Sequence, residues 1–305
     1  MDPDLSELTE LIPLDPTQFI GIPLALIGAV FLSLGAQFQH RGVVKVEART
    51  ADTLGKGLNF GQLALLLARP SWVLGTLMLA LAIVFQLGSL YFAPIIVVQP
   101  LGAIALVITS IVNSRVSHVK LKHKSIIAIV MCVGGVLLFV GVAAFTAVDQ
   151  PVTDQNLITI LIVLAVVLAV SGVAFGMFRH RIRAIFYVIM AGVLYGFVAT
   201  LAKVVLGRLE QGEFEWLTAL CVIGLLAATA LGAYFVQNAY ATGPPDLVIA
   251  GLTVVDPMVA VAIGIVVLGE ASQAPLWANF VFLVAGVIAV WGVFMLARNH
   301  PQTRL

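Results

Sequence analysis

The chain has 305 residues, a formal net charge of +1, 61% hydrophobic residues and only 10% charged residues. Its mean hydropathy is +1.10. Soluble domains carry about 25% charged residues, so this composition excludes an ordinary soluble fold and predicts an integral membrane protein with the lipid bilayer as its partner. The near-neutral charge also argues against a nucleic-acid partner.

Nine apolar segments are long enough to cross a bilayer, which takes roughly 20 residues in a helix. We therefore predict an all-α integral membrane protein with about nine transmembrane helices. The predicted spans are 19–39, 71–93, 95–114, 125–147, 157–178, 185–206, 216–238, 247–268 and 277–297.

The basic residues predict the orientation of these spans. With the N-terminus outside, 14 of the 16 lysines and arginines fall in inner loops or in the C-terminal tail, and only Lys203 and Arg208 fall toward the outside. Cytoplasmic loops are enriched in Lys and Arg. The sequence thus predicts a multi-pass protein of the cytoplasmic membrane with an external N-terminus and a cytoplasmic C-terminus.

An internal repeat accounts for most of the chain. Val97-Val98-Gln99-Pro100 returns 157 positions later as Val254-Val255-Asp256-Pro257, and the first and fourth spans align with the sixth and ninth in the same order. Matched spans are an odd number apart, so the halves point in opposite directions, as in the inverted repeats of secondary transporters.

This repeat gives a plan of four spans, one linking span and four further spans. The predicted parts are an acidic external tail (1–18), a first repeat with spans 1–4 (19–147) that includes a cytoplasmic loop and elbow helix (42–70), a linking region with span 5 (148–184), a second repeat with spans 6–9 (185–297) and a cytoplasmic tail (298–305).

Polar residues inside the spans are the candidates for a binding site. Asp256 is the one carboxylate deep in a predicted span, where a charge costs about 2.5 to 3.5 kcal/mol, and Gln99 is its repeat partner. Pro100 and Pro257 each follow one of these residues and free a backbone carbonyl one turn earlier, so they are candidate conformational hinges. For Asp256 the alternative is a neutral acid that only supports the bend.

Gln86, Gln237, Asn238 and Lys203 extend the candidate substrate-binding set. The alternative for each is a polar contact between helices. For Lys203 the alternative is a long side chain that reaches the membrane–water interface. Glu270 and Asp246 fall at predicted span ends, where we expect them to be solvated.

Other chemistry finds little support in the sequence. The five histidines lie in inner flanks or loops without metal-ligand spacing, Cys132 and Cys221 lie inside predicted spans, and nucleophile-elbow or phosphate-loop motifs are absent. We expect neither an enzyme nor a cofactor nor a resident metal. Gly172-x-x-x-Gly176 and Gly192-x-x-x-Gly196 predict close helix packing within the chain, with a homodimer as the less favoured reading.

Several of these stretches resemble a known family. Tyr240 through Pro244, Val255-Asp256-Pro257 and Leu268-Gly269-Glu270 look like the second half of the drug/metabolite transporter superfamily, in particular its bacterial EamA-type permeases. Ala93-Pro94 through Gln99-Pro100-Leu101-Gly102-Ala103 resembles the NIPA-like magnesium transporter branch, although Asp256 replaces a neutral residue of that branch. The resemblance implies a permease of the cytoplasmic membrane.

The sequence thus predicts a secondary transporter that moves a small organic solute, drug or metabolite by alternating access, with Asp256 as the group that couples transport to protons. The first alternative is a NIPA-like divalent-cation transporter, in which Asp256, Gln99 and carbonyls hold hydrated Mg²⁺. The second is a membrane scaffold in envelope assembly. A wide polar vestibule would favour the organic solute, a narrow carboxylate-lined path the ion, and no cavity the scaffold.

Overall fold

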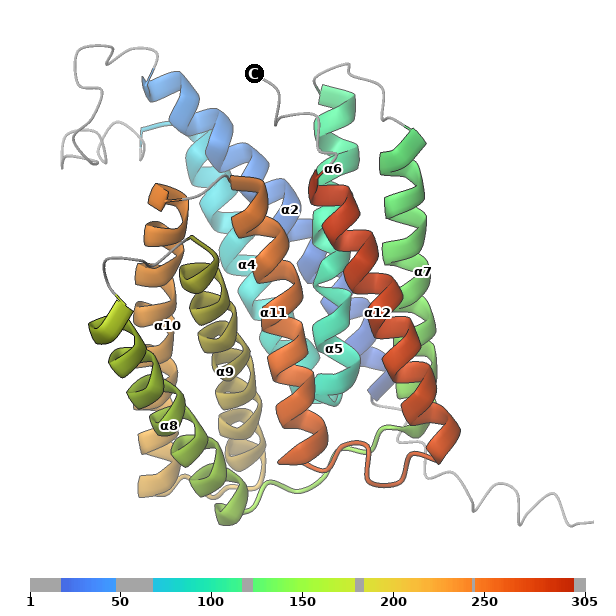
Figure 1. Ribbon diagram of the computed structural model, residues 1–305, viewed down its shortest axis with the longest axis vertical. Coiled ribbons are helices and arrows are strands. Elements are labelled where there is room, and N and C mark those ends of the chain that lie inside the picture. The colour runs from blue at the N-terminus through green and yellow to red at the C-terminus, as the bar shows by residue number, and fades with distance from the viewer. Residues whose placement is uncertain (1–17, 48–67, 117–122, 179–183, 243–244, 299–305) are drawn as a thin grey trace, which may run out of the picture.

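The computed structural model describes residues 18–47, 68–116, 123–178, 184–242 and 245–298. All regular structure in these ranges is helical, as the sequence predicts, and Figure 1 shows the helices as one bundle. The helices are α2 (Gln18–Glu47), α4 (Pro70–Phe92), α5 (Ile95–Leu101), α6 (Ala103–Val116), α7 (His123–Thr146), α8 (Asp154–Phe178), α9 (Ala184–Glu210), α10 (Trp216–Thr242), α11 (Pro245–Val266) and α12 (Leu276–Arg298).

Each predicted span corresponds to one helix, except that α5 and α6 together form the third. Eight helical stretches in the described ranges are long and apolar enough to cross a membrane, and α11 adds the shorter apolar stretch Gly251–Val266. Large apolar side chains such as Ile83 on α4 and Leu226 on α10 are 61% and 62% exposed. Exposed apolar surface of this kind is suited to lipid, so the structure supports a multi-pass membrane protein.

The helix contacts can be described by the two predicted halves, spans 1–4 and spans 6–9. In the first half α2 packs along α4, and in the second half α9 packs along α10. The chain runs through α9 in the direction opposite to α2 (Figure 1). The fourth helices of the halves, α7 and α12, pack against each other, and α5 contacts α11 at the centre of the bundle. The pattern of buried and exposed residues over 81–89 of α4 recurs position by position over 231–239 of α10, which is what a structural repeat produces.

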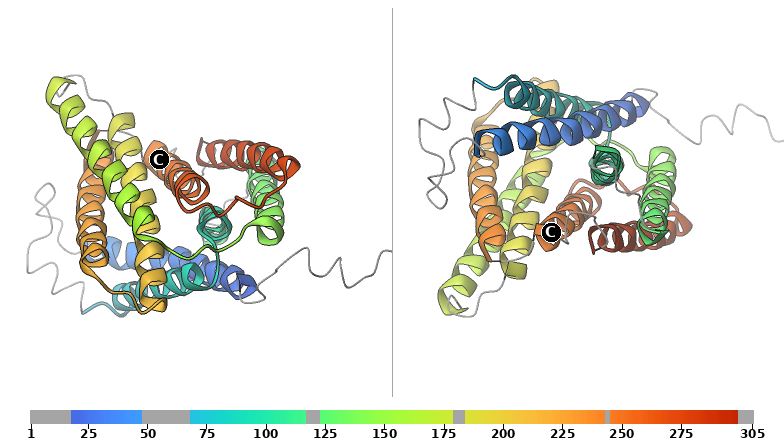
Figure 2. Two further views of the ribbon diagram at one scale, coloured as in Figure 1. Left: turned by 90° about the horizontal axis from the view of Figure 1, so that it is seen from below. Right: turned by 90° about the horizontal axis from the view of Figure 1, so that it is seen from above.

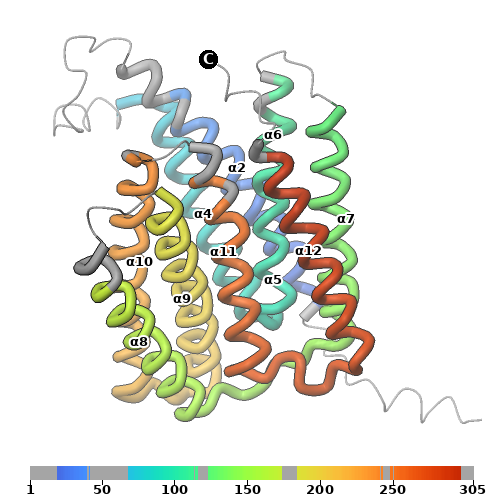
Figure 3. Tube along the Cα trace, viewed as in Figure 1, coloured from blue at the N-terminus to red at the C-terminus, as the bar shows by residue number. Residues whose placement is uncertain are grey.

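The linking helix α8 lies outside this arrangement. It contacts α9 and α10 of the second half, and the segment that leads to it from α7 runs across one end of the bundle (Figure 2). The loop after α11 and the break between α4 and α5 lie at that same end (Figure 3). We call it the outer end, because the distribution of basic residues predicts that it faces the outside of the membrane.

Small residues bring helices of the second half into close contact. A side chain at Gly192 or Gly196 would overlap Val255 or Val259 of α11 at 2.6 and 2.7 Å, so this glycine pair serves packing within the chain, as predicted. The prediction is wrong for Gly172, where a methyl group would meet nothing within 4 Å. Gly172 lies on a face of α8 that meets no neighbour, whereas the adjacent Ser171 contacts Met190 of α9.

The first helix is longer than the sequence predicts. The apolar segment ends near Gln39, but α2 continues to Glu47, because the polar residues that follow break the hydropathy pattern without ending the helix. Most of the predicted elbow segment, the acidic tail and the C-terminal tail lie outside the described residues.

Candidate functional site

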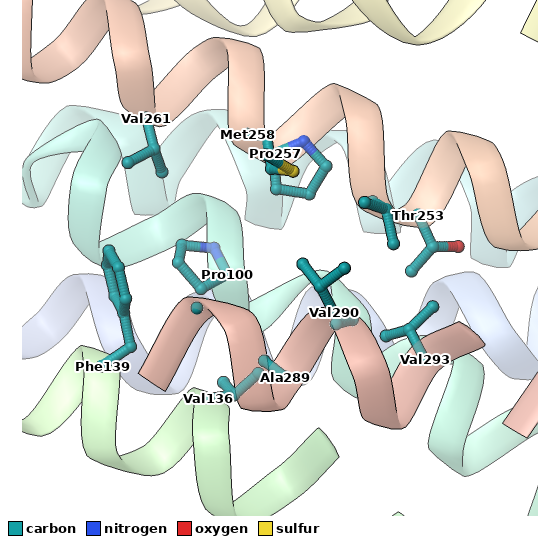
Figure 4. Close-up of a pocket in the computed structure, with 13 residues that line it drawn as sticks. Pro100, Val136, Phe139, Thr253, Pro257, Met258, Val261, Ala289, Val290 and Val293 are labelled. Carbon is teal, nitrogen blue, oxygen red and sulfur yellow. The ribbon is translucent and has the colours of Figure 1, made fainter. Parts of the chain in front are cut away.

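Two cavities lie between the halves. The central one, of about 100 Å³, is almost entirely apolar and is lined by both hinge prolines, Pro100 of α5 and Pro257 of α11 (Figure 4). Its other walls come from α7 and α12, with Phe139 and Val290 pointing into it. The two prolines thus lie at one cavity, but its lining carries no charged side chain, and the hydroxyl of Thr253 donates to the carbonyl of Ile249 in its own helix.

The larger cavity, of about 610 Å³, lies at the outer end and has charged walls. The end of α4 and the segment between α7 and α8 form one side, and the end of α9 forms the other. Its polar lining residues are Asp149, Gln150, Lys203, Glu210 and Gln211. A cavity of this size and mixed character at an interface is typical of small-molecule sites.

Lys203 forms part of the wall of the outer-end cavity, but its ammonium group has no free donor. The residue is 4% exposed, and Nζ donates to the carbonyl oxygens of Leu90 at 2.8 Å and Ala93 at 3.1 Å and to the carboxylate of Asp149 at 2.5 Å. An ammonium has three donors, so all are used. Lys203 thus fixes the end of α4, where a cation complements the helix dipole, and is placed to support the cavity more than to bind a ligand directly.

Glu270 is buried, which corrects the expectation that it is solvated. The residue is 1% exposed, and its two carboxylate oxygens accept hydrogen bonds from the backbone amides of Ile95 and Ile96, both at 2.8 Å. Gly269 adopts a positive φ of 69° and turns the chain after α11, so that the following residue folds back over the start of α5. The carboxylate satisfies amides that have no partner inside their own helix.

The surroundings of Glu270 are tightly packed, and they change the pKa of its carboxyl group. A side chain at Gly264 of α11 would lie 2.4 Å from Ile95 and 2.9 Å from the Glu270 carboxylate. Burial raises the pKa of the Glu270 carboxyl to about 7, against smaller lowering effects from Lys203 and from the amides of Ile95 and Ile96. A carboxyl group with such a pKa gains and loses its proton near neutral pH.

A second buried cation ties α9 to the loops at the outer end. Arg208, 4% exposed, pairs with Asp154 at the start of α8 and with Glu213 before α10, and donates to the carbonyl of Val152. These contacts fasten the linking helix to the second half. The sequence indicated only that Arg208 lies toward the outside.

Gln99 and Asp256 line neither of the two cavities. Gln99 is 6% exposed within α5. Asp256 is half-buried on α11, against Gly192 and Gly196 of α9, and its Oδ1 is buried without a hydrogen-bond partner. Their roles in binding stay predictions.

The other candidates are dispersed. Gln86 is half-buried on α4 and Gln237 is exposed on α10, while the amide of Asn238 donates to the carbonyl of Tyr234 in its own helix. Of the predicted set, only Lys203 reaches the outer-end cavity. Asp149, Glu210 and Glu270 were missed, because no local pattern indicates which loop and helix-end residues meet across the fold.

Similarity to other proteins gives a coarse assignment. The chain is 24% identical over 292 residues to a Corynebacterium glutamicum protein described as uncharacterised, covering 94% of this chain and 97% of the relative. It is 23% identical over 250 residues to NIPA9 of Arabidopsis thaliana, covering 76% of this chain and 71% of that protein.

NIPA3 of the same plant is 28% identical over 155 residues, or 50% of this chain and 40% of that protein. NIPA3 and NIPA9 are both described as probable magnesium transporters. No protein-family model matches the chain. No solved structure matches it either. Similarity to transporters, together with the apolar helices, supports a membrane transporter.

Proposed function

We propose that this protein is a secondary transporter of the drug/metabolite type, which moves a small organic solute by alternating access between its two halves. The observation that supports it is the outer-end cavity, of about 610 Å³, with walls from both halves. It has the form of a vestibule, which a scaffold without transport activity does not need.

The charges of this cavity favour a solute that has both polar and apolar parts. Tyr91 and Phe92 provide aromatic surface, while Glu210 and Asp149 provide carboxylates beside the buried Lys203 ammonium. Asp149 already pairs with Lys203, so Glu210 is the carboxylate left to meet a positively charged group of the solute.

Magnesium is the second candidate, because two relatives are described as probable magnesium transporters. Mg²⁺ is usually held by one or two carboxylates and several waters. In the described ranges, no three His, Cys, Asp or Glu side chains are grouped to hold a metal ion, and in the outer-end cavity Glu210 is the one carboxylate left without a paired cation, because Asp149 is paired with Lys203. We therefore place the organic solute first.

Both candidates can be tested in the same proteoliposomes. The purified full-length protein is reconstituted, Mg²⁺ entry is followed with a trapped magnesium dye, and uptake is followed for labelled amines, amino acids and carboxylates. We expect uptake of at least one organic probe and a several-fold loss of apparent affinity in Glu210→Gln.

The matched control is Glu215→Gln, which removes an exposed carboxylate just before α10. It should leave uptake unchanged. Mg²⁺ entry without uptake of any organic probe would make Mg²⁺ the favoured substrate and reject the organic solute.

A further inference from the structure

Glu270 joins the two halves at the outer end. The residue belongs to the second half, and the amides that it binds, those of Ile95 and Ile96, begin α5 of the first half. If the halves separate at this end, as alternating access requires, these two hydrogen bonds must break and the carboxyl group must enter water.

The closed arrangement gives Glu270 no direct cationic partner among the described residues. Lys203 of α9 faces it, but the three ammonium donors go to Leu90, Ala93 and Asp149. Asp149, from the segment between α7 and α8, adds a negative charge on the same side. An ionised Glu270 is therefore balanced by two amide dipoles and by a lysine whose charge Asp149 already offsets.

Burial and hydrogen bonding act in opposite directions on this group. The amides favour the ionised form, whereas a carboxylate that is 1% exposed loses nearly all of its hydration. The cost of burial is the larger of the two effects. In water the same carboxyl would ionise with an ordinary pKa of about 4.3.

We propose that Glu270 binds the coupling proton, and that the outer end closes over its neutral form and opens as the proton leaves. The proposal rests on the proposed transport function. It places coupling at Glu270 instead of Asp256, because the contacts of Asp256 with Gly192 and Gly196 lie within the second half and need not change when the halves move apart.

The sign of the pH effect follows from linkage. The closed outer end binds the proton more tightly than the open one, so acid pH favours closure. As the pH rises toward 7, the ratio of open to closed molecules increases by up to about tenfold per pH unit, and it levels off above about pH 8.

A cysteine reporter measures this opening without any solute. Val97 is 1% exposed in the first turns of α5, so Val97→Cys is introduced after replacing Cys132 and Cys221 by alanine. Modification by a membrane-impermeant thiol reagent is timed in right-side-out vesicles between about pH 5.5 and 8. The same reporter with Glu270→Gln, a mimic of the protonated side chain, corrects for the pH dependence of the reagent.

We expect the modification rate of the Glu270 protein, divided by that of the Glu270→Gln protein, to rise about tenfold or more between about pH 5.5 and about pH 8. The exposed-site variant Glu215→Gln should respond like the parent. A constant ratio at all pH values, or faster modification in Glu270→Gln, would overturn the proposal, the latter by showing that the ionised carboxylate holds the end shut.

A second measurement uses the unaltered chain, in case Glu270→Gln fails to fold. Hydrogen exchange of the α5 amides, corrected for intrinsic exchange, should lose protection as pH rises through 7, while the middle of α9 keeps its protection. Constant α5 protection would contradict the proposal. Because both measurements are made without solute, a pH response in a protein that transports no probe would retain the proton site and reject the transport function.

Discussion

At the scale of single residues, the outer end is organised by two buried side chains of opposite charge. Lys203 binds the carbonyls that end α4, and Glu270 binds the amides that begin α5. Each charge complements the helix end that it touches. The break at Ala93-Pro94 is thus held from both sides by the second half.

Lys203→Met should lower the free energy of unfolding by about 2 to 4 kcal/mol, because it leaves two buried carbonyls without donors and Asp149 without its cation. The lower part of this range is expected, since the Asp149 side chain is 43% exposed and is partly hydrated once unpaired. Thermal unfolding in detergent measures the change. Lys124→Met, at an exposed position at the start of α7, is the control and should shift stability by less than about 0.5 kcal/mol.

Asp256→Asn separates the two candidate acids. If Asp256 contacts the solute, as the sequence predicts, the variant should lose solute-induced thermal stabilisation but keep the pH response of the Val97→Cys reporter. Disappearance of that pH response in Asp256→Asn would return the coupling role to Asp256.

At the scale of helices, sequence patterns predict the spans well and their contacts poorly. Hydropathy and the 157-residue repeat locate α5 and α11, because lipid requires an apolar run at each crossing. Neither signal shows that Gly269 reverses the chain after α11, or that Asp149 and Lys203, 54 positions apart, form an ion pair. Charged residues at span ends are usually solvated, so burial of Glu270 depends on a fold that the local pattern does not encode.

Contact between α9 and α11 depends on glycine at the interface. Gly196→Ala places a methyl group 2.7 Å from Cβ of Val259, and overpacking of this kind costs about 1 to 3 kcal/mol. Gly172→Ala raises helix propensity as much as Gly196→Ala does, but its added methyl group lies in open space. We therefore expect Gly172→Ala to be the more heat-stable of the pair by at least about 1 kcal/mol in thermal unfolding, and equal stability would contradict the packing account.

At the scale of the whole molecule, the predicted halves meet around two cavities, a charged one at the outer end and an apolar one at the centre. Alternating access by relative motion of inverted halves fits this arrangement. The α7 and α12 pair is closely packed through Gly135 and Gly292, and so is placed to act as the pivot while the α4–α5 break and α9 separate.

The orientation of the bundle can be tested by labelling. Cysteines at Asp4 and Thr153 should react with an impermeant reagent from outside, and cysteines at Thr53 and Gln302 should react only after the membrane is opened, because inner loops hold most of the basic residues. Reaction of the Gln302 site in intact cells would remove the nine-span topology.

The most direct test of the central claim is a distance measured across the outer end. Spin labels are placed on Leu87 of α4 and Leu209 of α9, both exposed and in different halves, and the distance distribution is recorded by double electron–electron resonance in lipid nanodiscs. We predict two populations, with the longer distance favoured as pH rises from about 5.5 to 8 and the response lost in Glu270→Gln. A single distance, unchanged by pH and by every transported probe, would contradict a transporter whose halves move around a proton-controlled outer end.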